Sequence, residues 1–255
     1  PAIFWIWFET GSLNFTSGGI LDGKFPTEHL IFLIAMLVFG IGKAAIMPIH
    51  RWLPAAMVAP TPVSALLHAV AVVKAGVFSF LMVVVYIIGP DYLLHSKASN
   101  WLVWLSSFTI LTASIIAISK DDLKARLAYS TISQLSYIIL GAALATTFAL
   151  KGASFHIITH AIGKITLFFC AGAIYVTAHV KKISELGGLG FKTPMIFFAY
   201  TLGALSIIGV PPFIGSWSKL FLVIGSLEAD FLFVAILLGI SSLLNIYYLL
   251  QPVFI

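Results

Sequence analysis

The chain has 255 residues, of which 60% are hydrophobic and 9% are charged, whereas soluble domains carry roughly 25% charged residues. This composition excludes an ordinary soluble domain and indicates a polytopic membrane protein. The single cysteine excludes a disulfide framework within the chain. The net charge of +5 comes from basic residues that lie mainly in the connections on one side of the membrane, a distribution that argues against nucleic-acid binding.

Seven apolar runs are each long enough to cross a bilayer, and we expect them to form membrane helices. They cover residues 29–48, 62–89, 101–118, 125–149, 152–178, 195–224 and 231–250. Residues 9–28 are rich in Gly, Ser, Thr and Asn and predict a loop. Because the chain opens in PAIFWIWF and ends in QPVFI, we expect it to be an internal piece of a longer polypeptide.

Basic residues divide unevenly between alternate connections. One side holds Lys24, Lys97 and Lys151, and the other holds Arg51, Lys120, Lys124, Arg126, Lys181, Lys182 and Lys192. The positive-inside rule therefore predicts that the connections 49–61, 119–124 and 179–194 face the cytoplasm. We expect the chain to cross the inner (plasma) membrane of the cell several times. The remaining basic residues, Lys43, Lys74, Lys164 and Lys219, lie within apolar runs.

The first of these lysines accompanies a predicted helix break. Gly40 and Gly42 closely precede Lys43, and Pro48 follows it, a combination that predicts an interrupted or kinked helix. Discontinuous membrane helices hold ion sites in transporters. The structural alternative is that Lys43 extends its ammonium group to the nearby membrane surface.

The run 62–89 contains His68 and Lys74. On an ideal helix these two residues lie about 240° apart, so either a local distortion or water connects them, or each serves a different neighbouring helix. His68 is equally well explained as a hydrogen-bonding spacer between helices. Lys74 lies about 18 Å along the helix from Pro62, and hence near the middle of the bilayer.

The run 152–178 carries the strongest polar pattern. His156, His160 and Lys164 recur at every fourth position and therefore form one stripe on an otherwise apolar helix. A lysine at the centre of a membrane helix costs roughly 2.5–3.5 kcal/mol, so such a stripe faces protein or water. Three titratable groups in register favour an ion or proton path over a purely structural hydrogen-bonding face.

The run 195–224 is 30 residues long, and Gly209, Pro211 and Pro212 divide it. Lys219 follows this predicted break, so the combination of a Gly/Pro interruption and a membrane lysine occurs twice in the chain. Paired interrupted segments indicate a transporter built from inverted repeats.

Four long motifs then resemble a known family. The motifs are GKAAIMPIHRWLPAAMVAPTPVSALLHAVAVVKAGVF, DLKARLAYSTISQLSY, FHIITHAIGKITLFF and LSIIGVPPFIGSWSK. They resemble the antiporter-like, proton-conducting membrane subunits shared by respiratory complex I, membrane-bound hydrogenases and Mrp-type sodium/proton antiporters. The resemblance implies an all-α fold of about fourteen helices with two inverted repeats and two broken helices. Within it this single transmembrane domain, 1–255, would hold about seven helices, with 29–89 ending the first repeat and 101–250 forming the second.

The resemblance also implies roles for individual residues. Lys43 matches the lysine on the first broken helix, Lys74 and Lys164 match the central lysines, and Lys219 matches the residue on the second broken helix. His68, His156 and His160 match positions on the hydrated axis between them. The membrane glutamate that pairs with the first lysine in this family precedes the residues present here, because Glu9 falls in the predicted loop.

These observations predict a proton-translocating subunit of a larger membrane complex. A buried lysine can release and regain a proton near neutral pH, so protons would enter at a broken helix, pass the lysines and histidines with water, and leave by Lys219. A Mrp-type sodium/proton antiporter subunit is favoured. The alternative is a proton-pumping subunit of a complex I-like oxidoreductase or a hydrogenase, and a passive scaffold is a remote third reading. We expect no cofactor, metal or catalytic chemistry in the chain itself; the expected partners are other membrane subunits, the lipid bilayer, H+ and, for the antiporter, Na+.

Overall fold

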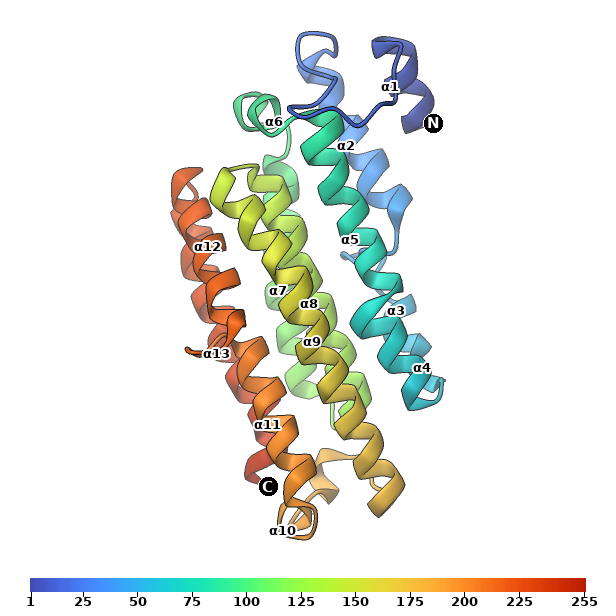
Figure 1. Ribbon diagram of the computed structural model, residues 1–255, viewed down its shortest axis with the longest axis vertical. Coiled ribbons are helices and arrows are strands. Elements are labelled where there is room, and N and C mark those ends of the chain that lie inside the picture. The colour runs from blue at the N-terminus through green and yellow to red at the C-terminus, as the bar shows by residue number, and fades with distance from the viewer.

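The computed structural model describes residues 1–255, except for the side chain of His68. The described regular structure is helical, apart from an isolated bridge between Asp122 and Lys182. The helices form an elongated bundle with α7, α8 and α9 in the middle, α2 and α5 on one side, and α11, α12 and α13 on the other (Figure 1).

The helix bounds are as follows. The α-helices are α1 (Ala2–Thr10), α2 (Thr27–Ile41), α3 (Trp52–Ala55), α4 (Thr61–Ala65), α5 (Val72–Val83), α6 (Pro90–Ser96), α7 (Asn100–Ser119), α8 (Leu123–Leu144), α9 (Thr147–Ala178), α10 (Leu189–Lys192), α11 (Pro194–Ile208), α12 (Ile214–Glu228) and α13 (Leu232–Phe254). The short 3-10 and π elements are η1 (Ala56–Val58), η2 (Leu66–Val70), η3 (Val84–Ile88) and η4 (Ile183–Glu185).

The prediction of an all-α polytopic membrane protein is confirmed, and helices occupy all seven apolar runs. Their continuity differs from the sequence prediction. Four helices, α7, α8, α9 and α13, are individually long and apolar enough to span a membrane. A fifth span can be formed by Val72–Ile88 with Pro90–Ser96, which are bent by 86° relative to each other. The remaining runs are divided into shorter helices.

The longest helix is α9, whose 32 residues extend about 48 Å. It begins at Thr147, five residues before the run expected from hydropathy. The reason is local: the Thr146 hydroxyl accepts a hydrogen bond from the backbone N–H of Ala149 at 3.3 Å and so caps the helix. In the same way, the Asp122 carboxylate caps α8 by accepting from the N–H of Ala125 at 2.8 Å.

The helix ladder stops near the first Gly/Pro cluster. Helix α2 ends at Ile41, and Gly42 follows with φ 54°. Gly40 is still helical, so the interruption begins two residues later than that glycine. The non-helical segment then continues through Pro48 to α3.

The ladder stops a second time between α11 and α12. Gly209 adopts the left-handed conformation with φ 86°, and its N–H donates to the carbonyl of Leu205 at 3.0 Å, which is the usual way a glycine ends a helix. Pro211 and Pro212 lie in the gap before α12 begins at Ile214.

The run 62–89 is also less regular than predicted. Between α4 and α5 the backbone forms the π-helical element η2, which contains His68. Ala71, at its end, has φ −94° and ψ −74°. A local distortion of the helix therefore lies between His68 and Lys74.

Two apolar clusters fill the bundle, and the polar residues of α9 lie between them. Ala149 and Ala153 belong to one cluster, together with residues of α2, α5 and α7. Residues from Leu167 to Ile174 belong to the other, together with residues of α11 and α13. The stretch from His156 to Lys164 is thus a polar layer between two apolar cores.

The three predicted cytoplasmic connections lie at the same end of the bundle (Figure 1). Arg126, counted with these connections in the sequence, is instead 3% exposed. Its guanidinium donates to the carbonyls of Ile118, Lys120 and Tyr248 and to the Gln251 side chain at 2.6–3.3 Å. It therefore ties the end of α7 to the end of α13. It satisfies carbonyls that the end of α7 leaves free and the carbonyl of Tyr248, whose partner four positions on is Pro252, a residue without an N–H.

Candidate functional site

The site begins with a contact between α5 and α9. The Lys74 ammonium nitrogen lies 2.6 Å from Nδ1 of His160, and both side chains are buried. An ammonium group only donates hydrogen bonds, so the imidazole nitrogen accepts whenever Lys74 is charged. The pair joins residues that are 86 positions apart in the sequence.

One turn earlier on α9, His156 connects to two further helices. Its Nδ1 lies 3.0 Å from the Ser218 hydroxyl of α12, and its Nε2 lies 3.1 Å from Oε1 of Gln134 of α8. The ring centroids of His156 and His160 are 6.0 Å apart. The described contacts include no hydrogen bond between the two imidazoles, so we expect a mobile group such as water to carry a proton between them.

Lys219 lies at the second helix interruption. Its ammonium donates to the carbonyl of Ile208 at 2.8 Å and to the Ser242 hydroxyl at 3.1 Å. Ile208 is the last residue of α11, and its carbonyl has lost its partner within the helix. The break therefore supplies an acceptor for a lysine inside the bundle, where the negative end of the α11 dipole also favours a positive charge.

Lys164 is fully buried and donates to the carbonyl of Leu127 on α8 at 3.1 Å. That carbonyl also accepts from the Thr131 hydroxyl at 2.9 Å. The Lys164 ammonium thus bonds a neutral backbone carbonyl. A buried cation that is held by a neutral group costs considerable free energy.

Tyr137 of α8 links the histidines to Lys219. Its ring stacks on His156 with centroids 5.4 Å apart and planes 17° apart. The Lys219 ammonium lies 5.3 Å from the centroid of the same ring. The tyrosine is therefore in contact with both groups, and its ring stabilises a charge on Lys219 through a cation–π interaction.

Several polar atoms around this layer are buried and lack a protein hydrogen-bond partner among the described residues. They include Nε2 of His160, Nε2 of Gln134, the Tyr137 hydroxyl, the Ser241 hydroxyl and Nδ2 of Asn245. Buried polar atoms normally bond to protein or ordered water. We therefore expect water molecules along α8, α9 and α13 at this level.

One predicted residue, Lys43, is not part of the cluster. Lys43 is exposed in the non-helical segment 42–51, which crosses α5 beside Gly76. The His68 side chain lies outside the described part of the structure. Elsewhere in the described chain, no three His, Cys, Asp or Glu side chains gather as metal ligands would.

The structure adds Ser218 and Tyr137 to the residues singled out from the sequence. Ser218 precedes Lys219 in the motif GSWSK, and Tyr137 ends the motif STISQLSY. Their roles in the cluster depend on how α8 and α12 pack against α9. The only sequence signal was their position within polar motifs on apolar runs.

Comparison with known proteins gives one consistent result. The family model "NADH:quinone oxidoreductase/Mrp antiporter, TM" matches residues 1–245. NADH-quinone oxidoreductase subunit N of Desulforudis audaxviator is 36% identical over 256 residues, covering 98% of this chain and 50% of that protein. NAD(P)H-quinone oxidoreductase chain 5 of a Synechocystis species is 35% identical, covering 85% of this chain and 33% of that protein.

Solved structures agree with this family. The Mrp complex of a Dietzia species superimposes with a TM-score of 0.86 at 26% identity, over 98% of this chain and 46% of the matched chain. An archaeal membrane-bound sulfane sulfur reductase gives 0.83 at 26% identity, over 97% and 50%. The chain spans half or less of each of these relatives. With the buried lysine–histidine layer, the broken helices and the match to residues 1–245 all in agreement, the chain belongs to the NADH:quinone oxidoreductase/Mrp antiporter transmembrane family.

Proposed function

We propose that the chain forms the proton-conducting core of an antiporter-like subunit in a multisubunit membrane complex. The observation that carries this proposal is the set of buried contacts from Lys74 through His160 and His156 to Ser218, which precedes Lys219. These groups cross the bundle from α5 to α12. Each can donate or accept a proton in one of its protonation states, or orient water that does so.

The expected steps follow the contacts. A proton on Lys74 transfers to Nδ1 of His160, which leaves a neutral amine and an imidazolium ion. Release from Nε2 of His160 to water then passes the proton toward His156 and Lys219. As expected from the sequence, Lys164 belongs to the same path: it lies one turn further along α9 than His160 and exchanges its proton with the layer through water.

Two versions of this function remain as proposals. Redox-driven proton pumping is supported by the 36% identity to a quinone oxidoreductase subunit over almost the whole chain. Sodium/proton exchange of the Mrp type, favoured from the sequence, is supported by the TM-score of 0.86 to the Mrp complex. The shared part of both is proton movement along the buried layer. We also propose that the chain lies in the plasma membrane. Family membership does not decide this, because a chloroplastic subunit is among the relatives.

The test uses the assembled complex in sealed vesicles, with proton and sodium movement measured in parallel. In His160→Gln the new amide oxygen still accepts a hydrogen bond from Lys74 but cannot carry a proton. We expect proton transport to be lost while the complex still assembles. The control is His95→Gln, because His95 lies at the outer end of the bundle and bonds the carbonyl of Asp91.

The outcomes separate the versions. Sodium-dependent proton movement without an electron donor supports the exchange function, whereas movement that requires electron transfer supports the pump. Near-normal proton transport by assembled His160→Gln would contradict the conducting role and favour a passive scaffold.

A further inference from the structure

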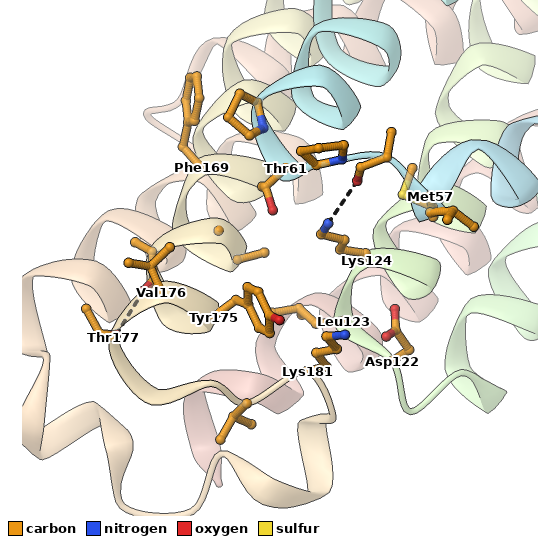
Figure 2. A pocket seen from close by; sticks show the side chains of 18 residues that line it. Met57, Thr61, Asp122, Leu123, Lys124, Phe169, Tyr175, Val176, Thr177 and Lys181 are labelled. Carbon is orange, nitrogen blue, oxygen red and sulfur yellow. Dashed lines mark hydrogen bonds between the residues drawn. The ribbon is translucent and has the colours of Figure 1, made fainter.

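A cavity of about 1080 Å³ lies at the end of the bundle that carries the basic connections. Figure 2 shows it between the segment before α4, the start of α8 and the last turns of α9. Its floor is tight: a Cβ on Gly172 of α9 would lie 2.6 Å from Cγ2 of Thr61. The cavity is separate from the lysine–histidine layer, whose residues do not line it.

The walls differ in chemistry. One wall carries Lys124 and Lys181, with Asp122 beside them (Figure 2). The opposite wall is formed by the outer face of α9, where Phe169 is 52% and Val176 is 72% exposed. A membrane helix with such exposed apolar side chains faces hydrocarbon or another apolar surface. The cavity is therefore apolar along α9 and positively charged at its membrane-surface end.

Neither lysine forms an ion pair among the described side chains, although the Asp122 carboxylate acts on Lys124 electrostatically. Lys124 donates to the carbonyl of Ala59 at 3.3 Å, and the Lys181 ammonium lies 5.0 Å from the centroid of the Tyr175 ring. The nearby Asp122 carboxylate is engaged as the cap of α8. The ion pair found among the described residues joins Lys182 and Glu185, which do not line the cavity.

These features fit one class of ligand. A phospholipid has an anionic headgroup for the lysines and acyl chains for the α9 wall, and basic pockets between membrane helices on the cytoplasmic side bind such headgroups. The volume of about 1080 Å³ is slightly above the range of about 300–1,000 Å³ for small-ligand pockets. An apolar protein helix in the same place would supply no anion to the two ammonium groups, whereas a phosphate does.

We propose that this cavity binds an anionic phospholipid, with its phosphate between Lys124 and Lys181 and an acyl chain along Phe169 and Val176. The site lies in the leaflet that faces the basic connections. Its occupant holds the start of α8 against the end of α9, below the buried layer.

The experiment uses two photoreactive lipids that carry a diazirine in the acyl chain, phosphatidylglycerol and phosphatidylcholine. Each is added to phosphatidylcholine vesicles that contain the assembled complex, and the labelled peptides are mapped by mass spectrometry. Because each lysine near the surface favours an anionic lipid by about fivefold, we expect phosphatidylglycerol to label residues 166–181 at least about fivefold more than phosphatidylcholine. A double variant that carries Lys124→Gln and Lys181→Gln should lose this preference for phosphatidylglycerol.

The matched control for Lys181→Gln is Lys182→Gln, which removes one charge from the same connection but from a residue that is paired with Glu185 and does not line the cavity. It should retain the preference. If the double variant does not assemble, Lys181→Gln alone provides the test, with a smaller loss. Equal labelling by the two lipids, an unchanged preference in the lysine variants, or cross-links that show a protein segment covering Phe169 and Val176 would each overturn the proposal.

Discussion

Nζ of Lys74 and Nδ1 of His160 lie 2.6 Å apart in the interior of the bundle. At this distance one nitrogen must donate and the other accept, so the two groups share a proton and their protonation states are coupled. Lys74 belongs to α5 and His160 to α9. The contact thus connects the end of one predicted repeat to the interior of the other.

This coupling predicts non-additive effects of substitution. Lys74→Met and His160→Gln should each reduce proton transport by at least about tenfold, because each removes one member of the same transfer step. The double variant should be no slower than the worse single variant. Initial rates of proton uptake by vesicles with equal amounts of assembled complex measure this. Independent, multiplying losses would show that the two residues act in separate steps.

The Tyr137 ring, rather than its hydroxyl group, is expected to support Lys219. Tyr137→Phe keeps the stack on His156 and the cation–π contact, whereas Tyr137→Leu removes both, at a cost of about 2 kcal/mol or more for a desolvated cation–π contact. We therefore expect near-normal transport by the Phe variant and a loss of at least about tenfold by the Leu variant. The reverse order of activity, or equal loss in both, would assign the role to the hydroxyl group.

Gly76 permits the non-helical segment to cross α5. A Cβ at this position would lie 2.6 Å from the backbone nitrogen of Ala44 and the carbonyl carbon of Lys43. Gly76→Ala should therefore destabilise the subunit by about 1–3 kcal/mol through overpacking. The midpoint of thermal dissociation of the complex measures this effect.

The matched control for Gly76→Ala is Gly40→Ala. Gly40 is helical, and an added Cβ there meets no atom within 4 Å. This variant should be neutral or slightly stabilising, since alanine is the better helix former by about 0.5–1 kcal/mol. Equal melting of the two variants would contradict the proposed close crossing of α5.

Asp121 holds two connections together at the basic end of the bundle. Its carboxylate accepts from the hydroxyl of Ser184 at 2.8 Å and from the backbone N–H at 3.0 Å. These two hydrogen bonds lower the pKa of Asp121 below its ordinary value. A lowered carboxyl pKa stabilises the contact above about pH 4 and loses that effect as the pH falls through the lowered pKa.

Hydrogen exchange at the Ser184 amide tests this contact. After correction for intrinsic rates, protection should be present at pH 7, fall in acid, and be absent at both pH values in Asp121→Ala. Glu185→Gln is the control, because Glu185 lies on the same connection but forms only an exposed pair with Lys182. Protection that is independent of pH in the unaltered chain would rule out the carboxylate as its source.

The positions of the helix breaks could be predicted because their causes are local. Gly209 ends α11 through its own left-handed backbone, and the prolines after it cannot continue the ladder. The stripe of His156, His160 and Lys164 was likewise visible because helical periodicity alone places them on one face.

The partners of these residues could not be predicted, because they depend on the relative positions of helices. His156 meets Ser218, 62 positions away, only in the observed register of α9 against α12. The π-helical turn at Leu66–Val70 also escaped prediction, since no glycine or proline marks its interior. Lys43 was expected within the membrane path, whereas in the described chain it is exposed.

Replacement of Lys164 by arginine tests the central claim most directly, since arginine keeps the positive charge but does not deprotonate in proteins. Proton transport by the assembled complex in sealed vesicles should fall at least about tenfold in both Lys164→Arg and Lys164→Ala. The control is Lys151→Arg, at an exposed position of the same helix, which should transport protons normally. Normal transport by an assembled Lys164→Arg complex, with loss only in Lys164→Ala, would show that Lys164 is a structural cation and would contradict proton transfer through this layer.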